Sequence, residues 1–130
     1  MPELFRLKEL AKQASQNAYA RYSNFKVGAV LVTPEGLVYQ GCNVENASYG
    51  LTCCAERTAI FAMISAGQRK IDTLVIYTAT PKATAPCGAC RQVINEFGPD
   101  ARVISVCDTD DHLDMPASAL LPHSFGPHSL

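Results

Sequence analysis

Cys54-Ala55-Glu56 and Pro86-Cys87-Gly88-Ala89-Cys90 are the two stretches around which this chain of 130 residues is organised. Together they offer three thiolates and one carboxylate. Three thiolates suit Zn²⁺, which is normally four-coordinate, and three protein ligands leave its fourth position open, as in a catalytic rather than a structural site. The pattern predicts a catalytic zinc site with one ion per chain, ligated by Cys54, Cys87 and Cys90.

The other three cysteines lie outside this pattern. Cys42 and Cys107 fall in or beside expected strands, where a cysteine usually acts as a small buried apolar residue. Cys53 adjoins a ligand and is an alternative to Cys54. Only Cys54 is followed two residues later by a glutamate, so the pattern favours Cys54.

Composition predicts one globular domain spanning residues 1–130, since 48% of the residues are hydrophobic and 18% are charged. The net charge is −1 without a basic stripe, which argues against a nucleic-acid partner. Residues 1–15 have no apolar core of a signal peptide, and no apolar run approaches the ~20 residues of a membrane span. We therefore expect a cytoplasmic protein with no membrane partner.

The order of expected elements indicates an α/β fold. A hairpin followed by alternating strands and helices predicts a mixed sheet, mostly parallel in its second half, with helices on both faces. Apolar periodicity predicts helices over 3–20, 54–66 and 88–97; strands over 27–32, 37–40, 74–77 and 103–106; a loop over 43–52; a short strand near 112–114; and a helical turn at 116–121.

The expected helix starts explain why cysteines stand where they do. Cys54 and Cys87 each begin a helix, and Cys90 follows Cys87 by one turn on the same face. The positive end of a helix favours a thiolate over a thiol. Three thiolates leave the site with a net negative charge, which Arg57 is expected to offset by hydrogen bonds to sulfur; whether Arg91 shares this role stays open.

Glu56 is the expected catalytic residue. It stands two residues from a ligand and cannot easily join the same coordination sphere, so it is placed to accept a proton from a water and pass it to a substrate nitrogen. A glutamate in a first helical turn is also favoured by the helix dipole alone. The neighbouring cysteines make the catalytic interpretation the stronger one.

The chain resembles the small, homotetrameric, zinc-dependent cytidine deaminases. The resemblance runs from Tyr22-Ser23-Asn24-Phe25-Lys26-Val27-Gly28-Ala29 to Leu120-Leu121-Pro122, so it covers nearly the whole chain. Its most specific pieces are Gly41-Cys42-Asn43-Val44-Glu45-Asn46-Ala47-Ser48-Tyr49-Gly50, Cys54-Ala55-Glu56-Arg57 and Pro86-Cys87-Gly88-Ala89-Cys90-Arg91-Gln92.

The resemblance implies a three-layer α/β/α cytidine deaminase-like fold and a set of substrate contacts. Asn43 and Glu45 would bind the 3′ side of the ribose, Phe25 would pack on the pyrimidine, and the Ala55 backbone would read the base edge. Three further residues would reach the site of a neighbouring subunit in a homotetramer: Ala47, Tyr49 and Phe125. His112, His123 and His128 are interpreted as surface or tail residues, since Cys54 fills the place that histidine takes in some relatives.

The implied reaction is hydrolytic deamination of cytidine and 2′-deoxycytidine to uridine and 2′-deoxyuridine, with release of ammonia, as in pyrimidine salvage. Three alternatives stay open. The substrate could be another cytosine nucleoside, such as a blasticidin-like antibiotic, or a nucleotide, although no basic cluster suits a phosphate. The chain could instead be a structural zinc domain with Cys53 as fourth ligand. Polynucleotide editing is disfavoured by the charge balance.

Overall fold

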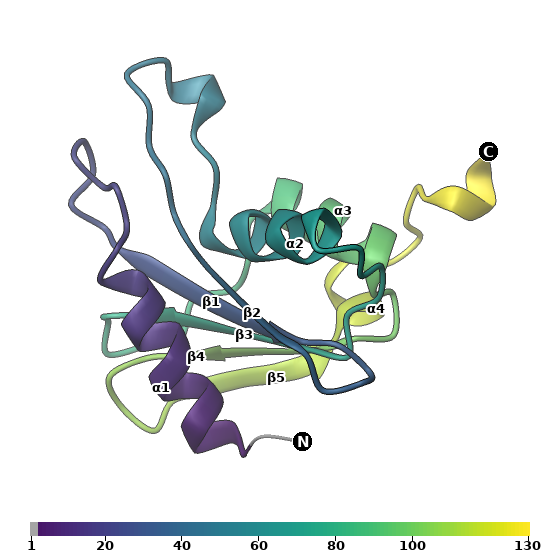
Figure 1. The fold of residues 1–130 in the computed structure, drawn as a ribbon, viewed down its shortest axis with the longest axis horizontal. Coiled ribbons are helices and arrows are strands. Elements are labelled where there is room, and N and C mark those ends of the chain that lie inside the picture. The colour runs from purple at the N-terminus through teal and green to yellow at the C-terminus, as the bar shows by residue number, and fades with distance from the viewer. Residues whose placement is uncertain (1–2) are drawn as a thin grey trace.

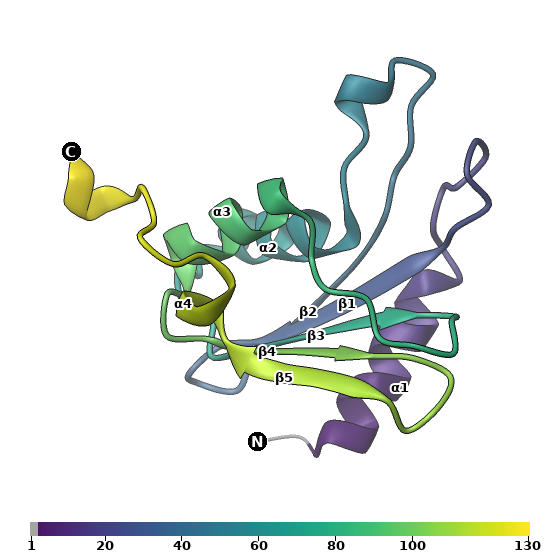
Figure 2. The same ribbon diagram turned by 180° about the vertical axis from the view of Figure 1, so that it is seen from behind.

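The computed structural model describes residues 3–130 as one mixed sheet covered by helices on both faces (Figures 1 and 2). The strand order is β2-β1-β3-β4-β5. The elements are α1 (Leu4–Ser15), β1 (Val27–Val32), β2 (Val38–Cys42), the 3₁₀ turn η1 (Tyr49–Leu51), α2 (Ala55–Ser65), β3 (Thr73–Thr78), α3 (Gly88–Phe97), β4 (Arg102–Val106), β5 (His112–Pro116), α4 (Ala117–Leu120) and the 3₁₀ turn η2 (Pro127–Ser129). Within residues 3–130 no helix combines the length and apolar character needed to cross a membrane.

The sheet contains one parallel pair. β1 runs antiparallel to both β2 and β3, β3 is parallel to β4, and β5 is antiparallel to β4. The expectation of a mostly parallel second half was therefore wrong for β5. The reason is the length of the connections: α3 provides the crossover that a parallel pair needs, whereas only residues 107–111 join β4 to β5.

Alternating strand residues build two cores, one on each face of the sheet. In β1, Ala29 and Leu31 belong to the core under α2 and α3, while Val30 and Val32 belong to the core under α1. All four side chains are fully buried. The predicted three-layer α/β/α arrangement is confirmed. Because successive residues of β1 are buried against helices on opposite faces of the sheet, the strand is apolar along its whole length.

The first helix ends earlier than its periodicity predicts, at Ser15 rather than at residue 20. The hydroxyl of Ser15 donates to the Lys12 carbonyl oxygen, and the chain then turns. Tyr19 pairs with the segment after β2: its N–H donates to Asn43 O at 3.0 Å, and its carbonyl accepts from Glu45 N at 2.9 Å. This long-range pairing takes the backbone groups that another helical turn would use.

Gly41 brings β2 against the backbone of α2. A Cβ at this position would lie 2.4 Å from Ala59 N and 2.6 Å from Ala55 O, distances at which atoms cannot coexist. The sheet and the first two turns of α2 therefore touch without an intervening side chain. This contact determines the distance between the start of α2 and the sheet.

Ionisation of Tyr77 is expected to lower the stability of the folded protein at alkaline pH. Burial, then the hydrogen bond that its hydroxyl donates to Asp108, raise the pKa of Tyr77 to about 12. The unfolded pKa is about 10, so the contribution is complete below pH ~10 and disappears as the pH rises towards 12. We expect Tyr77→Phe to cost about 1 kcal/mol at pH 8 and to flatten the loss of stability between pH 10 and 12. Urea midpoints of both proteins across this range would measure it; identical pH profiles would contradict the assignment.

Candidate zinc centre and substrate cavity

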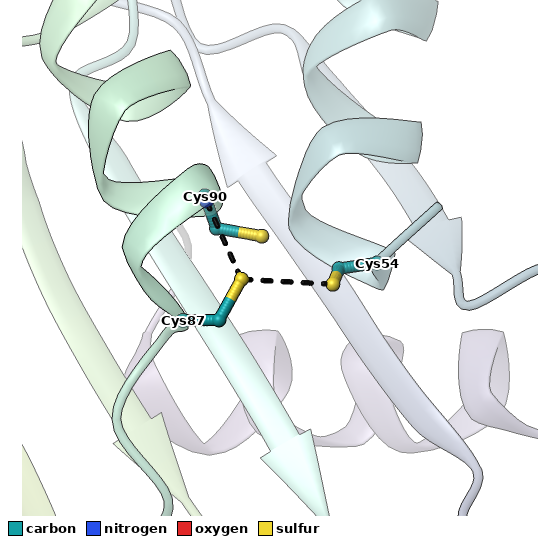
Figure 3. Close-up of side chains that lie close together, drawn as sticks. All are labelled: Cys54, Cys87 and Cys90. Atoms are coloured by element: carbon teal, nitrogen blue, oxygen red, sulfur yellow. Dashed lines mark hydrogen bonds between the residues drawn. The ribbon is translucent and has the colours of Figure 1, made fainter. Parts of the chain in front are cut away.

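The three predicted ligands meet between the starts of two helices (Figure 3). Cys54 immediately precedes α2, Cys87 immediately precedes α3, and Cys90 lies in the first turn of α3. Their sulfur atoms all lie within 4.8 Å of one another, with 3.8 Å between those of Cys54 and Cys87. Tetrahedral Zn–S bonds of about 2.3 Å require sulfurs about 3.8 Å apart. The cluster therefore fits zinc in both donor type and spacing.

The helix termini and neighbouring groups stabilise negative charge on this cluster. Hydrogen bonding from Cys90, and further hydrogen bonds from Arg57 and Cys87, lower the pKa of the Cys54 thiol to about 5 although burial opposes this. The contact with Cys54 and burial raise the pKa of Cys90. A bound metal ion would favour the thiolate form of all three cysteines.

The two arginines beside the cluster have different partners. A terminal nitrogen of Arg57 lies 3.5 Å from Cys54 Sγ and 3.4 Å from Thr52 O, and hydrogen bonding to Cys54 raises the pKa of the guanidinium. Arg91 instead donates from Nε to Pro86 O at 2.8 Å and from a terminal nitrogen to Leu120 O at 3.2 Å. Arg57 is therefore the arginine that contacts a sulfur.

Replacing Arg57 with glutamine is expected to weaken zinc binding by about 10–100-fold, the usual effect of removing a group that hydrogen-bonds a metal ligand. The cause is the loss of a positive charge beside Cys54 Sγ. Competition with a chromophoric chelator would measure the affinity, and Arg6→Gln on the exposed side of α1 is the matched control. An affinity equal to that of the control would show that Arg57 does not support the thiolates.

Glu56 is buried beside the sulfurs, with 5% of its surface exposed. Burial raises its pKa, and the negative charge of Cys54 adds to this, while Cys90 and Arg57 oppose it. A raised pKa makes the carboxylate a stronger proton acceptor, which suits a group that takes up a proton and returns it. Glu56 lines a cavity that Cys54 also lines.

This cavity has a volume of about 230 Å³. It lies between the start of β1, the end of β3 and the start of α2. It brings together the sequence-predicted residues Phe25, Asn43, Glu45, Cys54, Ala55 and Glu56. Its remaining lining residues, which sequence reasoning did not assign, are Ser23, Val27, Thr52, Ile76, Thr78, Thr84 and Ala85. Two signals were available: Ser23 stands in the segment that carries the resemblance, and Thr84-Ala85 directly precede the Pro86-Cys87 motif.

Asn43 holds the loop that carries Phe25. Its Oδ1 accepts from Val27 N at 2.8 Å, and its Nδ2 donates to Phe25 O at 2.8 Å. The amide thus mimics a strand partner just before β1 begins. One N–H and one acceptor position of the amide remain for other partners.

Ala47, Tyr49 and Phe125 lie outside this cavity. Ala47 and Tyr49 stand on an arm, residues 43–53, that projects beyond the sheet (Figures 1 and 2). Tyr49 is 77% exposed. Its ring packs edge-on against that of Tyr22, with 6.2 Å between the two ring centroids. Phe125, 62% exposed, lies in the C-terminal tail, where its carbonyl accepts from Gln92 Nε2 at 2.8 Å. Within this chain these three side chains do not line the cavity.

Comparison with known proteins identifies the same family. Residues 1–107 match the family described as cytidine and deoxycytidylate deaminase zinc-binding region. A cytidine deaminase from Halalkalibacterium halodurans is 46% identical over 116 residues, which are 88% of each chain. A more distant relative, a blasticidin-S deaminase from Bacillus cereus, is 30% identical over 74% of this chain and 76% of its own length.

Solved structures agree with the sequence comparison. The crystal structure of cytidine deaminase from Burkholderia pseudomallei superposes with a TM-score of 0.92 at 49% identity, covering 95% of this chain and 100% of the other. The mixed five-stranded sheet of this chain and the helices on it therefore form a cytidine deaminase-like fold. With a match over most of its length and a three-cysteine cluster that fits zinc, this chain belongs to the cytidine and deoxycytidylate deaminase zinc-binding family.

Proposed function

We propose that this chain is a zinc-dependent cytidine deaminase that converts cytidine and 2′-deoxycytidine, with water, into uridine and 2′-deoxyuridine and releases ammonia. The observation that carries the proposal is the joint position of Cys54 and buried Glu56 on the wall of one cavity. Cys87 and Cys90 complete the ligand set, with their sulfurs within 4.8 Å of that of Cys54. The curated and solved cytidine deaminases described above support the choice of substrate.

Glu56 is proposed to move protons during the reaction. Zinc held by the three thiolates would lower the pKa of a water molecule towards 7. Glu56 accepts the proton of the water that adds to C4 of the cytosine ring and delivers it to N3. It then carries a proton to the amino group, which leaves C4 as ammonia while the C4 carbonyl forms. The raised pKa of Glu56 suits both transfers.

The walls of the cavity are proposed to orient the nucleoside. Phe25 offers its ring to the pyrimidine, and the Ala55 backbone at the start of α2 reads the base edge. Asn43 and Glu45 stand on the strand-like segment after β2, where their amide and carboxylate suit the sugar hydroxyls. The four residues line the same cavity as Glu56, which supports one substrate pose across them.

Turnover of cytidine by zinc-replete protein, followed as loss of the cytosine ultraviolet absorbance, tests the proposal. We expect rapid loss for cytidine and 2′-deoxycytidine and little for cytidine monophosphate, because none of the residues among 3–130 that line the cavity is basic. Absence of turnover on both nucleosides in protein with one zinc per chain would refute the proposed activity. Turnover of blasticidin S alone would assign the other nucleoside specificity.

A purely structural zinc site is the candidate function of a different class, and it needs a fourth protein ligand. Within residues 3–130, the cluster of closely spaced metal-binding side chains comprises three cysteines. Cys53 Sγ lies 3.6 Å from Thr58 Oγ1 and 3.7 Å from Cys54 O, outside the cluster. X-ray absorption at the zinc edge should therefore show three sulfurs and one lighter atom; four sulfurs would favour the structural alternative.

We propose a homotetramer in which Ala47, Tyr49 and Phe125 contribute to the site of a neighbouring subunit. The arm exposes 77% of Tyr49 and 70% of Leu51, apolar surface that a partner would cover. Light scattering is expected to give four times the chain mass of 14.0 kDa. A monomeric mass would refute the assembly and the cross-subunit roles together.

We also propose that residues 1–130 form a single domain and that the protein is cytoplasmic. All six cysteines are free thiols in the structure, which a reducing compartment would preserve. Fractionation of cells that produce the protein would test the location.

A further inference from the structure

The hydroxyl of Ser23 lies between two residues that line the cavity. Glu45 Oε1 accepts from Tyr22 N at 2.9 Å and from Ser23 N at 3.0 Å, and Glu45 Oε2 accepts from Ser23 Oγ. Ser23 Oγ in turn accepts from Phe25 N at 3.0 Å. One hydroxyl thus connects the carboxylate at the sugar end of the cavity to the backbone that carries Phe25.

The local backbone supports this arrangement. Asn24 has φ +58°, the left-handed conformation that asparagine tolerates better than most residues. The sharp turn at Asn24 brings Phe25 N back towards Ser23 Oγ, as in turns closed by a serine hydroxyl. Ser23 itself is exposed, so its hydroxyl is not required to satisfy a buried group.

Hydrogen bonding leaves Glu45 with little free accepting capacity. An ionised carboxylate offers about four acceptor positions, and Tyr22 N, Ser23 N and Ser23 Oγ occupy three of them. The position that remains is on Oε2, the oxygen that Ser23 Oγ contacts. The direction in which Glu45 can accept from a substrate hydroxyl therefore depends on Ser23. The same hydrogen bond lowers the pKa of Glu45, which keeps the carboxylate ionised.

We propose that Ser23 is a positioning residue for the nucleoside: it aims the free acceptor position of Glu45 at a sugar hydroxyl and fixes the backbone of Phe25 at the base. This inference rests on the proposed function, because it assumes a nucleoside in this cavity. It adds a selectivity role, since the part of the effect that Ser23 exerts through Glu45 exists only for a sugar that presents a hydroxyl to Glu45.

Comparison of two substrates tests the proposal. Ser23→Ala is expected to lower kcat/KM for cytidine about 10–100-fold, mainly through KM, the usual effect of a hydrogen bond to a charged group. 3′-Deoxycytidine, which lacks the hydroxyl assigned to Glu45, should lose far less. Ser23→Thr keeps the hydroxyl and should restore the selectivity for cytidine. Zinc content and urea midpoints should match the wild type in both variants.

A double-mutant cycle with Glu45→Gln gives a second readout. If Ser23 acts through Glu45, the effects of Ser23→Ala and Glu45→Gln on cytidine will be strongly non-additive. Equal losses on cytidine and 3′-deoxycytidine, no loss on either, or additive effects would overturn the role of Ser23 while leaving the proposed function intact. Failure of the wild type to turn over cytidine would instead reject the proposed function, and this inference with it.

Discussion

Glu56→Gln is expected to lower kcat on cytidine by about 10²–10⁴-fold, the usual contribution of a positioned general acid or base. Glutamine keeps the shape and hydrogen-bonding surface of the side chain but cannot accept and return a proton. Steady-state loss of cytosine absorbance would measure kcat. KM should change little, because Glu56 is assigned to proton transfer rather than to holding the sugar.

Two further measurements separate catalysis from structure in this variant. Zinc content should stay at one per chain, since the three cysteines are unchanged. The urea midpoint should equal or exceed that of the wild type, because burial already disfavours the charged form of Glu56 and an amide carries no charge. Glu35→Gln in the exposed β1–β2 turn is the matched control. A Glu56→Gln protein that retains full turnover would contradict the proton-transfer role.

Gly41→Ala is expected to be strongly destabilising, costing about 3 kcal/mol or more. Overpacking commonly costs 1–3 kcal/mol, and here the new methyl group meets backbone atoms of Ala55 and Ala59 that cannot rotate away. α2 must move off β2, and Cys54 at its start moves with it. We therefore expect weaker zinc binding together with the loss of stability.

Gly88→Ala provides the matched control for this prediction. Gly88 follows Cys87 directly, yet a Cβ there would meet no atom within 4 Å. Its urea midpoint and zinc affinity should match or exceed those of the wild type, since alanine suits a helix better than glycine. If Gly41→Ala behaved like Gly88→Ala, the close contact of β2 and α2 would not be what positions the cluster.

Local sequence patterns predicted the zinc cluster because each of its ligands stands at or near the start of a helix. Cys87 and Cys90 are three residues apart on one helix, so helical spacing alone puts them on one face. Cys54 precedes the other helix, and the two helices pack on the same face of the sheet. Glu56 follows from its spacing to Cys54. These four positions depended on the helix starts at residues 54 and 87–88, which apolar periodicity located correctly.

Positions that depend on long-range pairing could not be derived in this way. The end of α1 is set by the pairing of Tyr19 with Asn43 and Glu45, residues more than twenty positions away. β5 runs antiparallel to β4 because the connection between them is short. The sequence of β5 itself indicates a strand only weakly. Ser23 shows the same limit in the cavity: only the folded chain brings its hydroxyl to Glu45.

The helix starts that carry Cys54 and Cys87 also bear on the entropic cost of binding zinc. These two residues are 33 positions apart in the chain. Joining them in an unfolded chain would cost about 3 kcal/mol of loop-closure entropy, whereas packing α2 and α3 on the sheet has already met that cost. Folding of the sheet and its two helices therefore brings the ligands together and lowers the entropic cost of binding zinc. The fold thus presents zinc with ligands from two helices that are already close together.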